Sequence, residues 1–110
     1  MAHPYYHALS SVKKWKGKSD DYLPVHNWFD ESKAFMIDVR HRALRHHAEG
    51  IFLCEQLFGT TIVNSDGMVV PVRWIGEQHV REDLNRIPTA QDWLRCLVPE
   101  AWMLRNNKID

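Results

Sequence analysis

The sequence predicts one α+β domain over residues 1–110, mainly helical, with about five helices around one core and a small antiparallel β-hairpin. The length of 110 residues is typical of a single domain. Hydrophobic residues make up 45% of the chain, which is enough for a packed core. Apolar residues recur at helical spacing in most segments, and one short stretch has the β-branched pattern of a hairpin.

The first helix is predicted over residues 3–17. Pro4 suits an early helical position and Gly17 is suited to end the helix. The apolar side chains between them recur at helical spacing: Tyr5, Ala8, Leu9, Val12 and Trp15.

The second helix is predicted over residues 19–35. Ser19 or Asp20 is expected to cap it, with acidic side chains at the positive end of the helix dipole. Pro24 is then expected in the first turn, because a proline there removes no helical hydrogen bond.

The third helix has the clearest pattern and is predicted from the capping residue Asp38 to the residue before Gly59. At about 100° per residue, one apolar face collects Leu44, Ala48, Ile51, Cys54 and Phe58. The opposite face, expected in solvent, collects Arg42, Arg45, His46, Glu49 and Gln56. Arg40, His47 and Glu55 fall on the apolar face, where each needs a partner.

A hairpin is predicted in residues 60–74, where two β-branched runs flank a turn with Asp66 and Gly67. Pro71 cannot donate a ladder hydrogen bond, so its strand is expected at an edge. A fourth helix is predicted over residues 75–86. A fifth is predicted to begin at Thr89, where Thr-x-x-Asp resembles a capping box.

The remaining tail, residues 99–110, is expected to pack through Trp102.

Composition excludes several classes of protein. Lys plus Arg equals Asp plus Glu, at 14 each, which argues against a general binder of nucleic acid or acidic membranes. The two cysteines form no CxxC pair, so a zinc ribbon or thioredoxin motif is absent. The N-terminal residues lack a signal-peptide core and no apolar run approaches a membrane span. We therefore expect a cytoplasmic protein with reduced thiols.

Two His-x-x-x-Asp pairs are the strongest chemical signal. His26 with Asp30 and His79 with Asp83 each place an imidazole and a carboxylate about one helical turn apart. If these helices also surround His47, the five side chains predict a site for zinc or manganese. A structural explanation stays open, because such pairs are usually surface hydrogen-bonded pairs and His47 can be a satisfied core histidine.

Glu55 and Arg40 also have two readings each. Glu55 is expected to be buried and paired with Arg40 or Arg73, or to act as a base or as an orienting group beside the metal. It lies about 12 Å along the helix from His47, so one ion cannot bind both unless the helix bends. Arg40, in a first turn, suits an anion site or a salt bridge to Asp30 or Glu31.

Several motifs resemble those of a family of small proteins encoded in bacteriophage and bacterial genomes. These are "YLPVHNWFDESKA", "RHRALRHHAEGIFLCEQLFG", "NSDG" and "IGEQHVREDLNRIPTAQDWL". The resemblance covers nearly the whole chain and implies a cytoplasmic protein of phage or prophage origin. It carries no catalytic residues. The histidines and aspartates are also similar to those of helical His-Asp metal phosphohydrolases, although the tandem His-Asp dipeptide is absent.

The leading hypothesis is therefore a polar His/Asp/Glu/Arg pocket that binds a divalent metal or a phosphate-like anion. Such a pocket would suit metal-assisted hydrolysis of a phosphoester or nucleotide, with Glu55 as base and Arg40 as anion contact. The alternative is a non-enzymatic, phage-type interaction protein that binds a host protein and has structural histidines. Homo-oligomers fit either hypothesis. Convergence of the His-Asp pairs on one point would favour the first.

Overall fold

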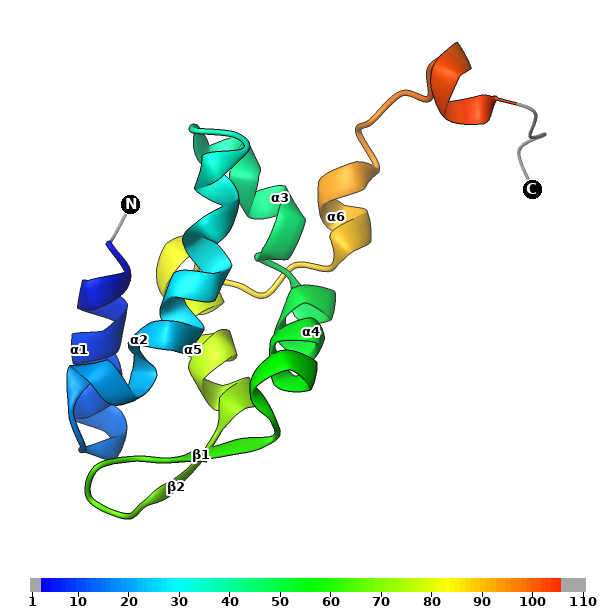
Figure 1. Cartoon of the computed structure of the whole chain (residues 1–110). Helices are drawn as coiled ribbons and strands as arrows, with labels where there is room; N and C mark the ends of the chain where they lie inside the picture. Colours follow the sequence, from blue (N-terminus) through cyan, green and yellow to red (C-terminus); the bar gives the residue numbers. More distant parts are fainter. Residues whose placement is uncertain (1–2, 106–110) are drawn as a thin grey trace.

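The computed structural model describes residues 3–105 and confirms a mainly helical α+β domain with a small antiparallel sheet (Figure 1). The longer helices form the body of the molecule: α1 (Pro4–Trp15), α2 (Ser19–Asp30), α4 (Ala48–Phe58) and α5 (Val72–Leu84). Short helical elements connect or follow them: η1 (Glu31–Ala34), η2 (Val39–His41), α3 (Arg42–Arg45), α6 (Ala90–Leu94) and η3 (Ala101–Leu104). No helix in this part of the chain is long and apolar enough to cross a membrane.

The helices α1 and α2 lie side by side, and a tight turn at Gly17 joins them (Figure 1). Gly17 has a φ of +76°, and a Cβ there would lie 2.6 Å from Asp21 Oδ2 and 2.9 Å from Asn64 Cβ. Its backbone N–H donates to Asp66 Oδ2 in the hairpin turn. Glycine is therefore required at this position both by its conformation and by the close approach of the hairpin.

The hairpin forms as predicted. Strand β1 (Thr61–Val63) pairs with β2 (Val69–Pro71), with Ile62 opposite Val70 and Thr61 opposite Pro71. Gly67 in the turn has a φ of +81°. Helix α5 begins directly after Pro71, so the hairpin delivers the chain to the helix that carries His79 and Asp83.

The core lies where α2, α4 and α5 meet. Gly76 on α5 makes close contact possible, because a Cβ there would lie 3.1 Å from Phe29 Cζ and 3.3 Å from Ile51 Cγ2. Beside this apolar cluster the interior is unusually rich in imidazole, since six of the seven histidines are buried: His7, His26, His41, His46, His47 and His79.

The predicted third helix is broken into three pieces, which corrects the helical-phase assignment. The chain forms η2 and α3, bends at His46 and His47, and starts again as α4. His46, expected in solvent, is fully buried, whereas Leu44, expected in the core, is 54% exposed. A break changes the direction in which every later side chain points around the helix axis. One helical wheel therefore could not describe the whole segment.

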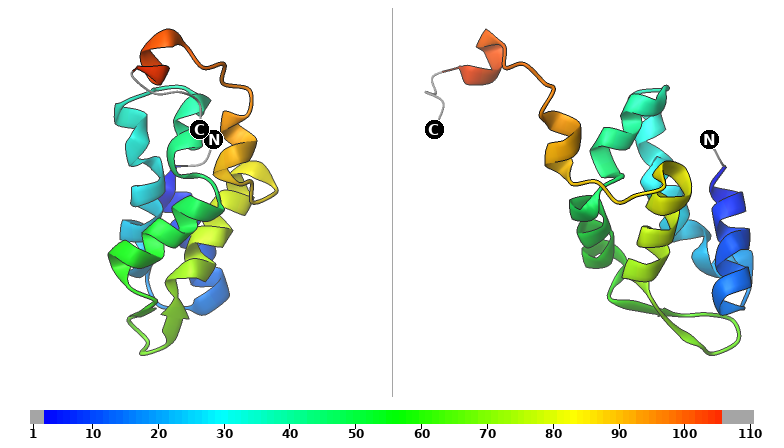
Figure 2. Two further views of the ribbon diagram at one scale, coloured as in Figure 1. Left: turned by 90° about the vertical axis from the view of Figure 1, so that its right-hand side faces the viewer. Right: turned by 180° about the vertical axis from the view of Figure 1, so that it is seen from behind.

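Pro24 and Trp102 also depart from expectation. Helix α2 begins at Ser19 after the N-cap Lys18, which puts Pro24 in the second turn, where its missing N–H costs a hydrogen bond. Burial of neighbouring side chains, among them Tyr22 and Val25, holds the helix together there. Trp102, expected to pack against the domain, is 71% exposed on a segment that leaves the body (Figure 2). The part of the tail beyond residue 105 lies outside the described residues.

Candidate metal centre

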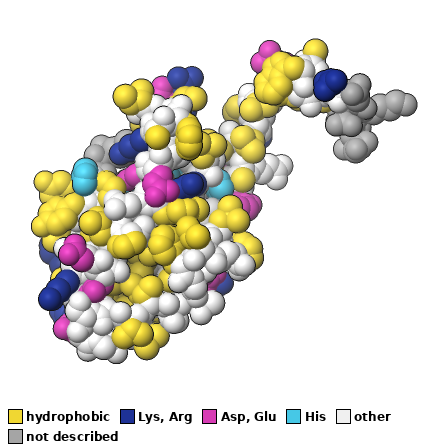
Figure 3. Space-filling view, viewed as in Figure 1, with side chains coloured by type: hydrophobic (Ala, Val, Ile, Leu, Met, Phe, Trp, Pro, Cys, Tyr) yellow, Lys and Arg dark blue, Asp and Glu magenta, His cyan; other side chains and the backbone are white. Residues whose placement is uncertain are grey.

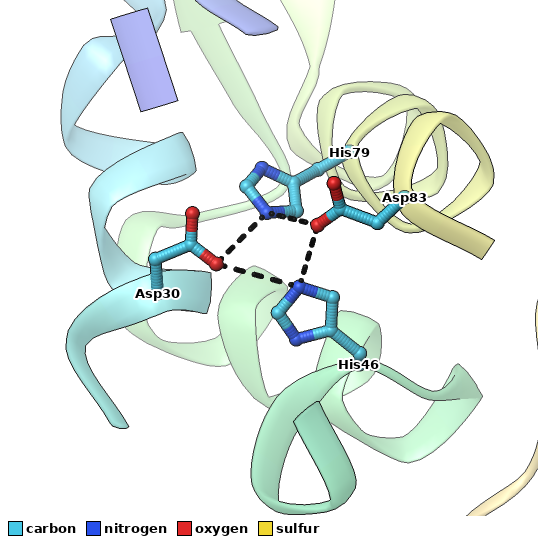
Figure 4. Close-up of side chains that lie close together, drawn as sticks. All are labelled: Asp30, His46, His79 and Asp83. Carbon is cyan, nitrogen blue, oxygen red and sulfur yellow. Dashed lines mark hydrogen bonds and ion pairs between the residues drawn. The ribbon is translucent and has the colours of Figure 1, made fainter. Parts of the chain in front are cut away.

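Four side chains from three parts of the chain converge in the interior: Asp30, His46, His79 and Asp83 (Figure 4). Asp30 is the last residue of α2, and His79 and Asp83 lie one turn apart on α5. His46 comes from the bend between α3 and α4. One ligand atom from each lies within 4.8 Å of the other three.

The four atoms form a closed ring in which nitrogen and oxygen alternate. His46 Nε2 lies 3.0 Å from Asp83 Oδ2 and 3.5 Å from Asp30 Oδ1. His79 Nε2 lies 3.4 Å from Asp83 Oδ2 and 3.5 Å from Asp30 Oδ1. Ligands at zinc distances of 2.0–2.1 Å in a tetrahedron stand about 3.4 Å apart. The four edges of the ring are therefore close to the separation expected between neighbouring ligands of one metal ion.

Burial makes the arrangement costly without a cation. The side chains of His46 and His79 are fully buried, and those of Asp30 and Asp83 are 5% and 2% exposed. Neither carboxylate oxygen of Asp30 has a hydrogen-bond partner among the described residues, and the same holds for Nε2 of His79. Two buried carboxylates need positive charge, and one divalent ion would balance both.

A hydrogen-bond network behind the ring fixes where the protons lie. The Gln78 amide nitrogen donates to His7 O at 2.9 Å and to Glu82 Oε1 at 2.9 Å. Both are acceptors, so the amide orientation is set and Oε1 of Gln78 must accept. The hydroxyl of Ser11 donates to it at 2.6 Å.

The network continues to the metal-facing imidazole. Because the Ser11 proton is used, His26 Nε2 is the donor in its 2.8 Å bond to Ser11 Oγ. A neutral His26 then accepts through Nδ1 from His79 Nδ1, 3.0 Å away. Nε2 of a neutral His79 is left with a lone pair directed at carboxylate oxygens of Asp30 and Asp83. Acceptors facing one another at this distance are typical of a cation site.

The pKa directions agree with this proton arrangement. Burial, followed by the neighbouring imidazoles of His79 and His7, holds the pKa of His26 well below its ordinary value. Burial likewise lowers the pKa of His46, although the hydrogen bond to Asp83 opposes the shift. Both imidazoles are therefore neutral at pH 7. His46 must be neutral to bind a metal ion, and His26 must be neutral to accept the hydrogen bond from His79.

The two carboxyl groups are ionised. Burial raises the pKa of Asp83, but the nearby imidazoles of His46, His7 and His79 together outweigh it and hold the pKa well below its usual range. Burial also raises the pKa of Asp30, and interactions with His79 and His46 lower it by more. The ring thus presents two imidazole nitrogens and two anionic oxygens.

The second carboxylate oxygen of Asp83 is also held. His7 Nε2 lies 3.2 Å from Asp83 Oδ1, and His7 Nδ1 lies 2.8 Å from Glu82 Oε1. An Arg42 nitrogen lies 3.9 Å from the same Asp83 oxygen. Arg42, expected in solvent, has a side chain only 12% exposed, which corrects its assignment. These contacts orient Asp83 toward the ring.

The bend that presents His46 is built by its neighbours. His47 is the N-cap of α4, and its Nδ1 accepts from the Gly50 N–H at 2.8 Å. A Cβ on Gly50 would lie 1.9 Å from the Arg45 carbonyl oxygen, so glycine lets the chain turn back on itself. Trp93 Nε1 donates to His46 O at 2.9 Å and ties the bend to α6.

The predicted site residues divide into two groups. The structure brings together Asp30, His79 and Asp83, adds His46, and places His26 directly behind His79. His47 caps α4 and is not in the ring. The sequence feature that pointed to His46 was the pair of adjacent histidines before Gly50. This pair could not be interpreted as part of a site while the segment was predicted as one continuous helix.

Glu55 and Arg40 lie outside the ring. Glu55 is mostly buried and lies 3.2 Å from Arg73, as expected from one of its two readings. Arg40 is 74% exposed and pairs with Asp38, not with Asp30 or Glu31. Its expected position on an apolar face is wrong, because that face belonged to a continuous helix that does not form.

An open pocket of about 470 Å³ borders the ring at Asp30. Lys33 lies in its wall with Nζ 4.0 Å from Asp30 Oδ2, and His3 and Asn27 line the same pocket. Asp30 is therefore the ring member through which a small molecule in the pocket would be nearest to the centre.

Fold and site together define a small helical protein with a buried His/Asp cluster that could hold one metal ion. A sequence model described as a domain of unknown function, DUF6915, matches residues 2–103, and the chain belongs to this family. Neither a curated protein nor a solved structure shows significant similarity to the chain.

Proposed function

We propose that the protein binds one divalent metal ion between Asp30, His46, His79 and Asp83, and that the ion joins α2, α5 and the bend before α4. One observation carries the proposal: the lone pair of His79 Nε2 and two carboxylate oxygens face one another in a buried ring with edges of 3.0–3.5 Å. Two nitrogens and two oxygens in a small ring suit zinc better than manganese, which favours more oxygen ligands.

The first role of the metal is structural. Four protein ligands and nearly complete burial are typical of closed sites that stabilise a fold, whereas catalytic sites keep a ligand position open. The ring also connects segments that lie far apart in sequence, so one ion would hold the helices in register.

Metal analysis and thermal unfolding of untagged protein test this role. Zinc at about 100 times its Kd should add about 2.7 kcal/mol of stability and raise Tm by roughly 10 °C. Asp30→Asn keeps the side-chain volume and should remove the zinc response. The control is Asp21→Asn, which removes a carboxylate bonded to Ser65 and should lower Tm while leaving the zinc response intact. Absence of bound metal, with no heat of binding for several divalent ions, would contradict the proposal.

The second candidate is metal-dependent hydrolysis of a phosphoester or nucleotide, which the pocket beside Asp30 favours. Lys33 would hold a phosphate there, and the metal would supply an activated water. Glu55 and Arg40 do not line this pocket, so Lys33 replaces Arg40 as the anion contact in this proposal.

Hydrolysis of bis(p-nitrophenyl) phosphate by zinc- or manganese-loaded protein tests the second candidate. Activity that falls in Lys33→Ala and persists in Lys13→Ala, on the exposed end of α1, would support it. If the metal-loaded protein shows no turnover, the second candidate is wrong and only the structural role remains.

The expected alternative, an interaction protein of phage origin that binds a host protein, rests on a different observation. Several large apolar side chains are exposed, including Phe35 at 81% and Trp102 at 71%. Neither side chain belongs to the ring of Asp30, His46, His79 and Asp83, so a binding surface and a metal ion are compatible in one protein.

A further inference from the structure

The last described segment, residues 95–105, stands clear of the rest of the molecule and is called the arm here (Figures 1 and 2). It carries Leu97, Val98 and Trp102, which are 52%, 77% and 71% exposed, and no residue of the arm is buried. Among the described residues, its hydrogen bonds are local and reach back only to Gln91. In the described part of the chain, Arg95 borders a pocket beside Leu84 and Pro88, and the arm makes no hydrogen bond to the four long helices.

The arm is part of the domain. The family match extends to residue 103 and so includes Leu97, Val98 and Trp102. The principal extents of 54 × 26 × 23 Å reflect a molecule that is drawn out along one axis. An apolar arm in this position exposes surface that monomeric proteins usually cover.

A second apolar surface lies at the same end of the molecule, opposite the hairpin (Figure 1). It is the turn of residues 35–39, called the apolar turn here. Phe35, Ile37 and Val39 are 81%, 90% and 57% exposed. Figure 3 shows hydrophobic side chains on the arm and on the upper body, with a notch between them.

We propose that the protein is a two-fold dimer in which the arm of each copy lies across the apolar turn of the other. A two-fold axis makes the contact reciprocal. Each arm covers the partner's apolar turn, so both arms and both turns are buried in the same dimer. The three apolar side chains of an arm would bury on the order of 400 Å², and the reciprocal pair, with both turns, on the order of 1,500 Å². That area is within the range of specific dimers. The dimer does not depend on the metal centre.

Sedimentation velocity on the full chain at about 100 µM tests the dimer. The wild type should sediment as a particle with twice the 13.0 kDa mass of one chain. Trp102→Ser and Phe35→Ser should each weaken association at least tenfold. Both side chains are exposed, so the variants should keep the wild-type circular dichroism spectrum.

The matched control is Leu57→Ser, which removes an apolar side chain 63% exposed at the end of α4 that leads to the hairpin. This variant should remain dimeric. The proposal is overturned by a monomeric wild type, by a dimer that persists in both Trp102→Ser and Phe35→Ser, or by a Leu57→Ser variant that dissociates.

Discussion

His26, which the sequence predicted as a metal ligand, instead contacts a candidate ligand from behind. Its spacing to Asp30 suggested direct ligation, but its Nδ1 contacts the imidazole of His79. Spacing along one helix could predict that His26 and Asp30 share a side of α2. It could not predict that α5 would put His79 between His26 and the centre of the ring, because that depends on helix packing.

His26→Phe should weaken zinc binding by about 10–100-fold, because the orientation and tautomer of His79 would lose their hydrogen-bond partner. The matched control is Tyr22→Phe, which removes a fully buried hydroxyl that donates to Lys16 O and accepts from Asn64 and contacts no member of the ring. Competition with a chromogenic chelator measures both affinities. Equal losses in the two variants would show that His26 acts only through core packing.

The two cysteines should differ sharply in reactivity. Burial raises the pKa of the Cys54 thiol to about 12, whereas Cys96 is exposed near the start of the arm. At pH 8 iodoacetamide should modify Cys96 within minutes and leave Cys54 intact until the protein unfolds. Peptide mass spectrometry reads both sites. Rapid alkylation of Cys54 in folded protein would mean that the core opens.

Local sequence rules predicted the separate elements best. Pro at the first helical position marked α1, the Asp-Gly turn marked the hairpin, and Thr89 with Asp92 formed the predicted capping box. The rules failed for residues 38–58, where they predicted one helix. The helical spacing of apolar residues continues there although the helix itself is broken. The break exists because His47 caps α4 and Gly50 admits the Arg45 carbonyl, and these are contacts that periodicity does not include.

At the scale of the element, Pro24→Ala should stabilise the protein by about 1–2 kcal/mol. Alanine restores an N–H in the second turn of α2, and this gain exceeds the entropy returned to the unfolded chain. The control is Pro4→Ala at the first helical position, where no helical bond is regained. Urea unfolding measures both changes. A destabilised Pro24→Ala would mean that the proline ring itself contributes needed packing.

At the scale of the molecule, metal stabilisation should depend on pH. A lowered pKa keeps the Asp30 carboxylate ionised from pH 7 to pH 5 and keeps His46 neutral at pH 7, so protons compete with the ion at the imidazoles as pH falls. The rise in Tm on adding zinc should therefore be large at pH 7 and small at pH 5. Differential scanning calorimetry at the two values tests this. An equal rise at both would contradict competition between protons and the ion for the imidazoles.

The long connection across the metal centre has a kinetic consequence. About fifty residues separate Asp30 from His79, so the chain must close a large loop before both can hold one ion. We expect this contact to form after the folding transition state, because the loop must close before both side chains can reach the ion. Zinc should then slow unfolding many-fold while hardly changing the refolding rate, as stopped-flow experiments in urea would reveal. An equally large acceleration of refolding would instead make the metal part of the folding nucleus. With a late-forming site, a bound ion would mainly slow unfolding of the finished protein, and the lifetime of the native state would follow the supply of metal.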